Sequence, residues 1–323
     1  MNLIVTGAGG FIGQELAAAL LADNRVTKLI LTDVMEPSLS SYIVKDGKVE
    51  IQCVKADLTS AEQCSKLFTS DLDVVYLLHG IMSGAAEANL ELGLKVNLDS
   101  TRTILDIMRK VKPGVKVIFP SSLAVYGAPG PQEVVSENTI PLPGSSYGSQ
   151  KLICETLLND FSRRRLLDGR ICRFPTVVVR PGAPSGAASS FASGIIREPL
   201  KEIKSSLPVS KGLEMWVSSP QTVVRNLVLA MDVPKESYEA GSRTVNLPGI
   251  TVTVEEMLAA LKTVGGQKAV DLVEERRDPA VEKIVGNWPA RFNTKKAKKL
   301  GFVDDRSLVQ TIEAYVKQYS SQI

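Results

Sequence analysis

Short hydrophobic runs rich in β-branched residues alternate with helix-length amphipathic segments over the first two-thirds of the chain. This alternation constrains the fold most strongly, because it is typical of a parallel sheet with helices on both faces. The expected strands cover residues 3–6, 28–32, 50–55, 74–78, 115–120 and 172–178. The expected helices between them cover residues 11–22, 61–68, 86–110 and 147–167. We therefore predict an α/β fold with a doubly wound parallel sheet.

The charge of the chain favours no polyanionic partner. Its 323 residues include 38 basic and 35 acidic side chains, a formal net charge of +3. We therefore expect no nucleic-acid binding. The densest basic run is predicted to be a solvated helix face, and it consists of Lys295, Lys296, Lys298 and Lys299. Because the start lacks a signal-peptide pattern and no apolar run reaches about 18 residues, we expect a cytoplasmic protein without a membrane span.

The cysteines and the histidine limit the chemistry. Cys53, Cys64, Cys154 and Cys172 form no CxxC pair, and His79 is the single histidine. We expect free thiols in a reducing compartment. The same scarcity argues against a zinc site and against a histidine-dependent triad. Tyrosine, lysine and carboxylate side chains remain as acid–base candidates.

A glycine-rich turn follows the first strand and precedes a helix. Gly7, Gly10 and Gly13 have the spacing of a dinucleotide-binding turn, and Phe11 and Ile12 begin the helix. The first glycine permits a tight turn, the second a close approach of the backbone to a pyrophosphate, and the third close helix packing. The helix N-terminus adds free N–H groups. The alternative is a tight turn without a ligand; a Rossmann-type site for a dinucleotide is favoured.

Polar residues at the ends of later strands extend this predicted site. Asp33 stands twenty residues beyond Gly13, where a carboxylate can bind the adenosine ribose and repel a 2′-phosphate, so NAD is favoured over NADP. Asp33 could instead cap a turn or helix. Asp57 and Leu58 follow the third strand near the adenine position, although Asp57 could equally cap the next helix.

The fourth strand ends in Leu78, His79 and Gly80, over which a dinucleotide would pass. Since His79 has no second histidine or cysteine as a partner, we expect a packing or cofactor-wall residue rather than a base. All three residues are predicted to contact the cofactor.

A tyrosine and a lysine one helical turn apart form the predicted catalytic centre. Tyr147 and Lys151 lie at positions i and i+4, hence on one helical face. A close ammonium is expected to lower the pKa of the phenol, so that it can exchange a proton with an alcohol. Ser122, at the end of the fifth strand, is placed to bind the substrate oxygen. Asn97 is a candidate for a relay beside Lys151 and for a cofactor contact.

These motifs together resemble the extended short-chain dehydrogenase/reductases. The resemblance covers nearly the whole chain and rests on the glycine turn, on the pair Ser121–Ser122, on Tyr147-x-x-x-Lys151 and on the run 180–182. It implies that Tyr147 is the general acid/base, that Lys151 binds the nicotinamide ribose, and that Ser122 binds the substrate oxygen. Family members that dehydrate sugar nucleotides carry an Asp-Glu pair where this chain has Leu123-Ala124, so dehydration is not expected.

Longer strings resemble those of D-erythronate dehydrogenases within this family. They cover residues 81–87, 99–102, 174–182 and 187–200. The resemblance implies oxidation of a four-carbon sugar acid at C2 to the 2-oxo acid with NAD. Three residues of the sixth expected strand are also predicted to contact the cofactor, namely Pro175, Thr176 and Val177.

A small polyhydroxy acid needs hydroxyl partners and one cation. Ser83, Ser189 and Ser190 offer hydroxyls, and Arg197 offers a fork for the carboxylate. Arg197 could equally be a surface residue. Arg180 and Arg225 are the rival cations.

The regular alternation of strands and helices loosens after residue 180. We expect residues 1–180 to form the NAD-binding domain that carries Ser122, Tyr147 and Lys151. Residues 181–323 should form most of a smaller α/β substrate-binding lobe, some of whose elements could return to the first domain.

Two other functions stay open. A nucleotide-sugar 4-epimerase would use the same Ser-Tyr-Lys set without net NADH production, and a silent NAD-sensing protein would show no turnover. Relatives often pair through helices like 86–110 and 147–167, so a homodimer is one expectation.

Overall fold

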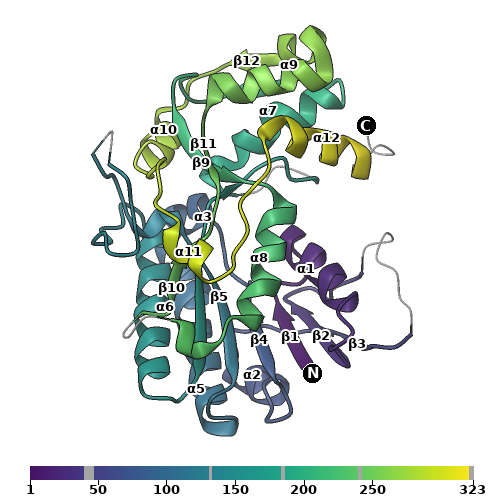
Figure 1. Ribbon diagram of the computed structural model, residues 1–323, viewed down its shortest axis with the longest axis vertical. Coiled ribbons are helices and arrows are strands. Elements are labelled where there is room, and N and C mark those ends of the chain that lie inside the picture. Colours follow the sequence, from purple (N-terminus) through teal and green to yellow (C-terminus); the bar gives the residue numbers. More distant parts are fainter. Residues whose placement is uncertain (40–46, 131–132, 183–185, 239–241, 320–323) are drawn as a thin grey trace.

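A parallel seven-stranded sheet forms the centre of the larger lobe (Figure 1). The computed structural model describes residues 1–39, 47–130, 133–182, 186–238 and 242–319. The strand order is β10-β6-β5-β4-β1-β2-β3, and every pairing is parallel. The strands are β1 (Asn2–Thr6), β2 (Lys28–Asp33), β3 (Glu50–Lys55), β4 (Val74–Leu77), β5 (Lys116–Ser122), β6 (Asp168–Phe174) and β10 (Thr244–Asn246). The prediction of a doubly wound α/β fold is confirmed.

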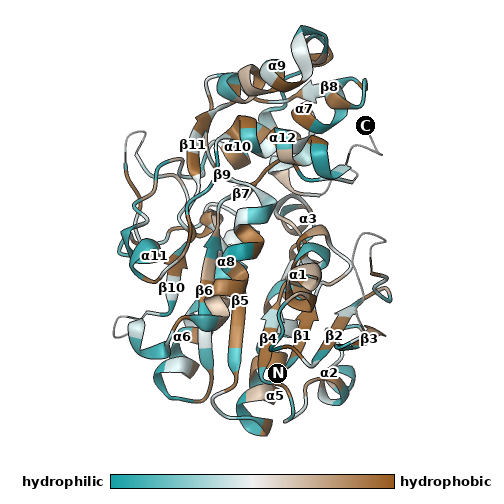
Figure 2. Cartoon of the chain, turned by 45° about the vertical axis from the view of Figure 1, so that its right-hand side comes forward, coloured by the Kyte–Doolittle hydropathy of each residue, from teal (hydrophilic) through white to brown (hydrophobic). Residues whose placement is uncertain are grey.

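Helices cover both faces of this sheet. Residues of α1 (Phe11–Leu21) and α8 (Pro220–Asp232) share one apolar cluster with Leu3 and Val5 of β1. Residues of α2 (Ala61–Leu67), α5 (Ser100–Val111) and α6 (Ser146–Arg163) share another with Ile4. Figure 2 shows the resulting hydrophobic interior along β1, β4 and β5. Strands buried on both faces in this way explain the continuous apolar runs of the sequence.

The strand order reverses at β1, which lies between β2 and β4. In open α/β sheets, ligands bind beyond the carboxyl ends of the strands at such a switch point. The glycine turn follows β1, and residues 78–80 follow β4. The topology therefore brings two of the predicted cofactor segments to one crevice.

The expected single helix over residues 86–110 is broken. The structure has α3 (Ser83–Ala88), α4 (Leu90–Gly93), a π-helical segment (Leu94–Asp99) and then α5. The break lies at Asn89, whose backbone is extended and whose side chain accepts a hydrogen bond from the N–H of Leu92. Asparagine side chains compete with the backbone in this way, which favours a cap over a helix interior.

The sixth strand also differs from its expected bounds. It begins four residues early, at Asp168, and ends before Pro175, which has no N–H to donate. The chain then leaves the main sheet, and β7 (Thr176–Val177) pairs with β9 (Glu214–Ser218). This departure carries the chain into the smaller lobe.

The smaller lobe lies above the carboxyl edge of the main sheet in Figure 1. It has a three-stranded sheet of β7, β9 and β11 (Ile250–Thr253) and a two-stranded sheet of β8 (Ser205–Leu207) and β12 (Val273–Glu275). Its apolar cluster comes largely from α7 (Phe191–Leu200), α9 (Val254–Asp271) and α12 (Leu308–Tyr319), with α10 (Pro279–Val285) beside them. Within the described ranges, no helix is long and apolar enough to cross a membrane.

Two smaller predictions are confirmed. The basic run forms α11 (Lys295–Lys299), in which Ala297 is buried and Lys295, Lys298 and Lys299 are exposed. The four cysteines are free thiols.

Candidate active site

A cavity of about 510 Å³ lies at the carboxyl edge of the main sheet, between the two lobes. It is lined by the glycine turn, the ends of β4 and β5, the first turns of α6, and the chain that follows β6. Most residues predicted for the site line it: Gly7, Gly10, Phe11, Ile12, Gly13, Leu78, His79, Ser83, Ser122, Tyr147, Lys151, Pro175, Thr176, Val177, Ser189 and Arg197. Six others do not: Asp33, Asp57, Leu58, Gly80, Asn97 and Ser190.

The glycine turn has the geometry that a phosphate cradle needs. Gly7 has a φ of +64°, and a Cβ there would lie 2.7 Å from the backbone nitrogen of His79. A Cβ at Gly13 would lie 2.5 Å from the carbonyl oxygen of Gly7. Helix α1 starts after Gly10, whose lack of a side chain leaves the first N–H groups without a cap from this position. This end of the cavity can therefore hold the diphosphate of a dinucleotide through backbone N–H groups and the helix dipole.

The carboxylate of Asp33 lies directly beside this turn. Its Oδ2 accepts a hydrogen bond from the N–H of Gly9 at 3.0 Å, and its Oδ1 accepts one from the N–H of Val34 at 2.7 Å. Both bonds orient the carboxylate, and each oxygen keeps a lone pair for further donors. A contact of Asp33 with the adenosine ribose stays a prediction.

Asp57 and Leu58, which follow β3, interact with neighbouring parts of the protein. Asp57 Oδ1 accepts hydrogen bonds from the N–H of Thr59 at 2.9 Å and from its hydroxyl at 2.8 Å, and these bonds lower the pKa of Asp57. Leu58 is buried in the core. The N-cap of α2 is Ser60, not Asp57. A contact of Asp57 or Leu58 with adenine stays a prediction.

His79 is held as a neutral side chain. Its Nδ1 lies 2.8 Å from Thr6 Oγ1, and its Nε2 lies 2.8 Å from Ser100 Oγ. Burial, with a smaller effect from the charge of Lys151, lowers the pKa of His79 to about 3. An imidazole with both nitrogens engaged and such a pKa is a poor general base. His79 lines the cavity, and its contact with the cofactor stays a prediction.

Tyr147 and Lys151 face the cavity from the first turns of α6. The Ser145 hydroxyl caps this helix by accepting from the N–H of Gly148 at 3.2 Å. Lys151 Nζ donates to the carbonyl of Pro120 at 2.8 Å and lies 5.7 Å from the ring centroid of Tyr147. Lys151 is thus anchored to the end of β5, one turn beyond the phenol.

The protonation states differ from the sequence-based expectation. A lysine one turn away was expected to lower the pKa of the phenol, but burial raises the pKa of Tyr147 to about 12. Burial also lowers the pKa of Lys151 to about 8, against the smaller opposing effects of Cys154 and Glu155. That expectation is wrong for the protein's own groups, because desolvation outweighs a charge held at this distance.

Ser122 ends β5 opposite Phe174 of β6, at the rim of the cavity. Its Oγ accepts a hydrogen bond from the N–H of Ala124 at 3.1 Å. Because this bond uses a lone pair, the hydroxyl hydrogen can still be donated to a substrate oxygen.

Asn97 lies in the π-helical segment, behind the cavity wall. Its Oδ1 accepts from the N–H of Ile81 at 2.8 Å, and its Nδ2 donates to Gln150 Oε1 at 2.8 Å. Asn97 therefore joins the chain after β4 to α6, and Gly80 packs against its side chain. A relay role beside Lys151 stays a prediction.

The residues predicted for substrate binding are partly engaged within the protein. The Ser83 hydroxyl accepts from the N–H of Ala188 at 3.2 Å. Arg197, which is 3% exposed, donates to the carbonyl of Arg180 at 2.9 Å and pairs with Glu198. Burial and the charge of Arg197 lower the pKa of Arg180, which also lines the cavity.

Among the remaining candidates, Arg225 is exposed on α8, away from the residues that line the cavity. Sequence reasoning missed several lining residues: Met82, Pro120, Ser121, Leu123, Phe174, Pro181, Gly182, Ala187 and Trp288. Trp288 follows α10, far along the chain, and no spacing rule connects it to the glycine turn.

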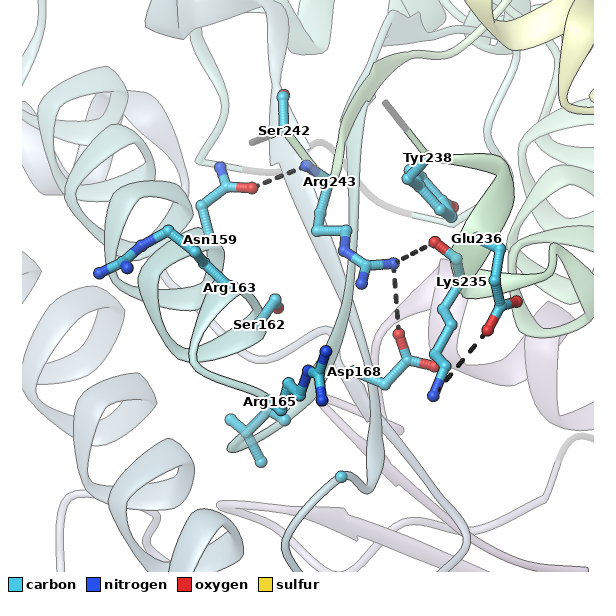
Figure 3. Close-up of a pocket in the computed structure, with 12 residues that line it drawn as sticks. Asn159, Ser162, Arg163, Arg165, Asp168, Lys235, Glu236, Tyr238, Ser242 and Arg243 are labelled. Atoms are coloured by element: carbon cyan, nitrogen blue, oxygen red, sulfur yellow. Dashed lines mark hydrogen bonds and ion pairs between the residues drawn. The ribbon is translucent and has the colours of Figure 1, made fainter. Parts of the chain in front are cut away.

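A second cavity, of about 650 Å³, lies at the opposite edge of the sheet, beside the starts of β5 and β6 (Figure 3). It shares no lining residue with the first. Four of its charged residues contact one another: Arg243 lies 3.5 Å from Asp168 and donates to the carbonyl of Lys235, whose ammonium faces Glu236. The glycine turn and the Ser-Tyr-Lys set belong to the first cavity alone.

A model of the NAD dependent epimerase/dehydratase family matches residues 3–234. A D-erythronate dehydrogenase from Haemophilus influenzae is 39% identical over 319 residues, which cover 98% of this chain and 99% of that protein. A D-erythronate dehydrogenase from Cupriavidus necator is 41% identical over 326 residues, covering 98% of each.

A solved structure, titled a nucleoside-diphosphate-sugar epimerase from Agrobacterium tumefaciens, has a TM-score of 0.90 and 34% identity. The match covers 99% of this chain and 95% of that one. The family match, the near full-length similarity and the phosphate cradle agree. The chain belongs to the NAD dependent epimerase/dehydratase family, with NAD as its cofactor.

Proposed function

We propose that this chain oxidises the C2 hydroxyl of a small sugar acid such as D-erythronate to the 2-oxo acid. One observation carries the proposal: Ser122, Tyr147 and Lys151 line the same cavity as the glycine turn. The two relatives named D-erythronate dehydrogenase support the choice of substrate, since the similarity covers nearly the whole chain.

Tyr147 is the proposed general base for the C2 hydroxyl, and Ser122 donates a hydrogen bond to the same oxygen. Because burial favours the neutral phenol, the phenolate needs positive charge nearby. When bound, NAD supplies the hydride acceptor and a nicotinamide ring that is cationic in its oxidised form. Lys151 adds a second cation one turn away, and the proton of the C2 hydroxyl passes to Tyr147.

The carboxylate of the acid is proposed to meet two adjacent cations. Arg180 and Arg197 both line the cavity, and burial together with the charge of Arg197 lowers the pKa of Arg180. An anion between the lobes would relieve this repulsion. The guanidinium of Arg197 holds the Arg180 carbonyl and Glu198, so we assign it a bracing role. We propose the direct contact for Arg180, which lines the cavity and whose Nε donates to Ser193 Oγ.

A screen for NADH formation over four- to six-carbon aldonic acids tests the proposal. Tyr147→Phe should reduce turnover by orders of magnitude and leave NAD affinity nearly unchanged, because it removes only the proton acceptor. Tyr315→Phe is the matched control, since it removes a buried hydroxyl from α12, outside the cavity lining. Full activity of Tyr147→Phe would refute the assignment of the base.

A second candidate function is epimerisation of a nucleotide sugar. It is favoured by the 34% identical structure whose title names a nucleoside-diphosphate-sugar epimerase. An epimerase returns the hydride to its substrate, so it would interconvert sugar nucleotides without net NADH. Net NADH from an aldonic acid would decide for the dehydrogenase, whereas epimer formation without NADH would decide against it.

A further inference from the structure

Successive turns of α6 are attached to successive residues at the end of β5. Lys151 and Glu155 follow Tyr147 at spacings of four residues, which places all three on one helical face. Lys151 Nζ donates to the carbonyl of Pro120 at 2.8 Å, and the hydroxyl of Ser121 donates to Glu155 Oε1. Glu155 therefore touches the residue directly before the proposed substrate-binding serine.

Glu155 also forms a buried ion pair with Arg173 of β6. Arg173 Nε lies 2.9 Å from Glu155 Oε1, and Nη2 lies 2.6 Å from Oε2, so the contact is a two-bond fork. The two residues are 2% and 6% exposed. Arg173 Nη1 donates to the hydroxyl of Tyr126 at 2.5 Å, and Tyr126 lies 2.8 Å from Asn246 Oδ1 on β10. One carboxylate thus joins α6, β5 and β6.

Stability alone does not account for such a pair. Removing two charges from water costs about as much as their attraction returns, and apolar residues of similar shape often replace buried pairs without loss. The position of the ion pair beside the cavity says more about its role. Ser121 is in register with Arg173, and the next pair, Ser122 and Phe174, lines the cavity.

Glu155 is also the charged neighbour of Lys151. Tyr147, Cys154 and His79 surround the ammonium as well, but burial raises the pKa of Tyr147 to about 12 and that of Cys154 to about 11, and lowers that of His79 to about 3. All three are therefore uncharged near pH 7. Cys154 and then Glu155 oppose the effect of burial on the pKa of Lys151, and of these two Glu155 is the one held in an ion pair as a carboxylate.

We propose that Glu155 is a positioning residue for this site. It clamps the end of β5 against α6, so that Ser122 and Tyr147 keep their places on the same cavity, and it places a carboxylate one helical turn from Lys151. The catalytic consequence rests on the proposed function, whereas the effect on Lys151 does not depend on any substrate.

Glu155→Gln tests the proposal, because glutamine keeps an acceptor for Ser121 and loses the charge. Lys151 should then titrate about one pH unit lower, as expected for loss of a close opposite charge. The titration can be followed by NMR of ¹⁵N-labelled lysine, with Lys151→Met to assign the signal. The alkaline limb of kcat/KM should move to lower pH by the same amount. At its optimum, kcat/KM should fall on the order of tenfold to 100-fold.

Two further variants separate positioning from simple loss of stability. Asp168→Asn breaks the pair of the half-buried Asp168 with the buried Arg170 at the other end of β6, and should lower the melting temperature without moving either titration. The double variant Glu155→Met with Arg173→Met removes both charges, and should regain much of the lost stability while kcat/KM stays low.

The inference is overturned if Lys151 titrates as in the wild type in Glu155→Gln, or if kcat/KM falls no further than in Asp168→Asn. A wild-type protein that forms no NADH from any aldonic acid would contradict the proposed substrate class. The Lys151 titration would still decide the role of Glu155.

Discussion

Replacing Gly7 by alanine tests the close packing of the glycine turn against the end of β4. The residue has a φ of +64°, and an added Cβ would lie 2.7 Å from the His79 nitrogen and 2.8 Å from the Leu78 carbonyl carbon. The left-handed conformation costs an alanine roughly 1–2 kcal/mol. Forcing the two backbone segments apart costs roughly 1–3 kcal/mol more. We expect Gly7→Ala to lower the free energy of unfolding by about 2–5 kcal/mol.

Gly301→Ala is the matched control, because Gly301 has a φ of +89° and nothing within 4 Å of an added Cβ. It should lose only the roughly 1–2 kcal/mol of backbone strain. Urea unfolding followed by circular dichroism measures both variants, and calorimetry measures NAD binding, which Gly7→Ala should weaken and Gly301→Ala should leave unchanged. If both variants lost the same free energy of unfolding, the clash of an added Cβ with residues 78–79 would be refuted. If Gly7→Ala bound NAD as tightly as the wild type, the role of the glycine turn in binding the diphosphate would be refuted.

Three further predictions concern charge. Asp33→Ala should weaken NAD binding more than NADP binding, because it removes the ribose acceptor and the repulsion of a 2′-phosphate; an unchanged preference in calorimetry would contradict the role. The pKa of His79 is lowered from 6.5 to about 3, so the unfolded protein binds a proton between these pH values and the folded protein does not. The free energy of unfolding should therefore be unaffected by His79 above pH 6.5 and should fall by about 1.4 kcal/mol per pH unit as pH falls toward 3. The free energy of unfolding of His79→Gln should depend less steeply on pH across this range. Arg180→Gln should raise KM for the acid by about tenfold or more and leave the affinity for NAD unchanged. An unchanged KM would mean that a different cation binds the substrate carboxylate.

The order of elements was predictable because it depends on local patterns. Hydrophobic runs predicted the strands, and the glycine spacing after β1 predicted the turn that lines the cavity. The errors occurred where one side chain overrides a periodic pattern. Asn89 breaks the long helix by capping Leu92, and Pro175 ends β6 and diverts the chain to the smaller lobe. Neither change interrupts the apolar periodicity from which the elements were predicted.

Protonation states were less predictable than residue identity. The spacing of Tyr147 and Lys151 correctly predicted that both side chains line one cavity. It did not predict that burial would dominate the pKa of each group. Desolvation depends on how many segments cover a side chain, and a spacing of four residues contains no such information.

On the substrate side of the cavity, residue type alone also did not predict which groups each side chain contacts. Ser83 and Arg197 were chosen for their chemical type, yet one binds the backbone of Ala188 and the other braces the carbonyl of Arg180. A hydroxyl or a guanidinium serves a substrate or the fold equally well, and tertiary structure decides between them. Two arginines seventeen positions apart become a pair only because α7 folds back over the chain that follows β7. Selectivity for acids would then follow from the cost of placing two like charges together, which an anionic substrate reduces.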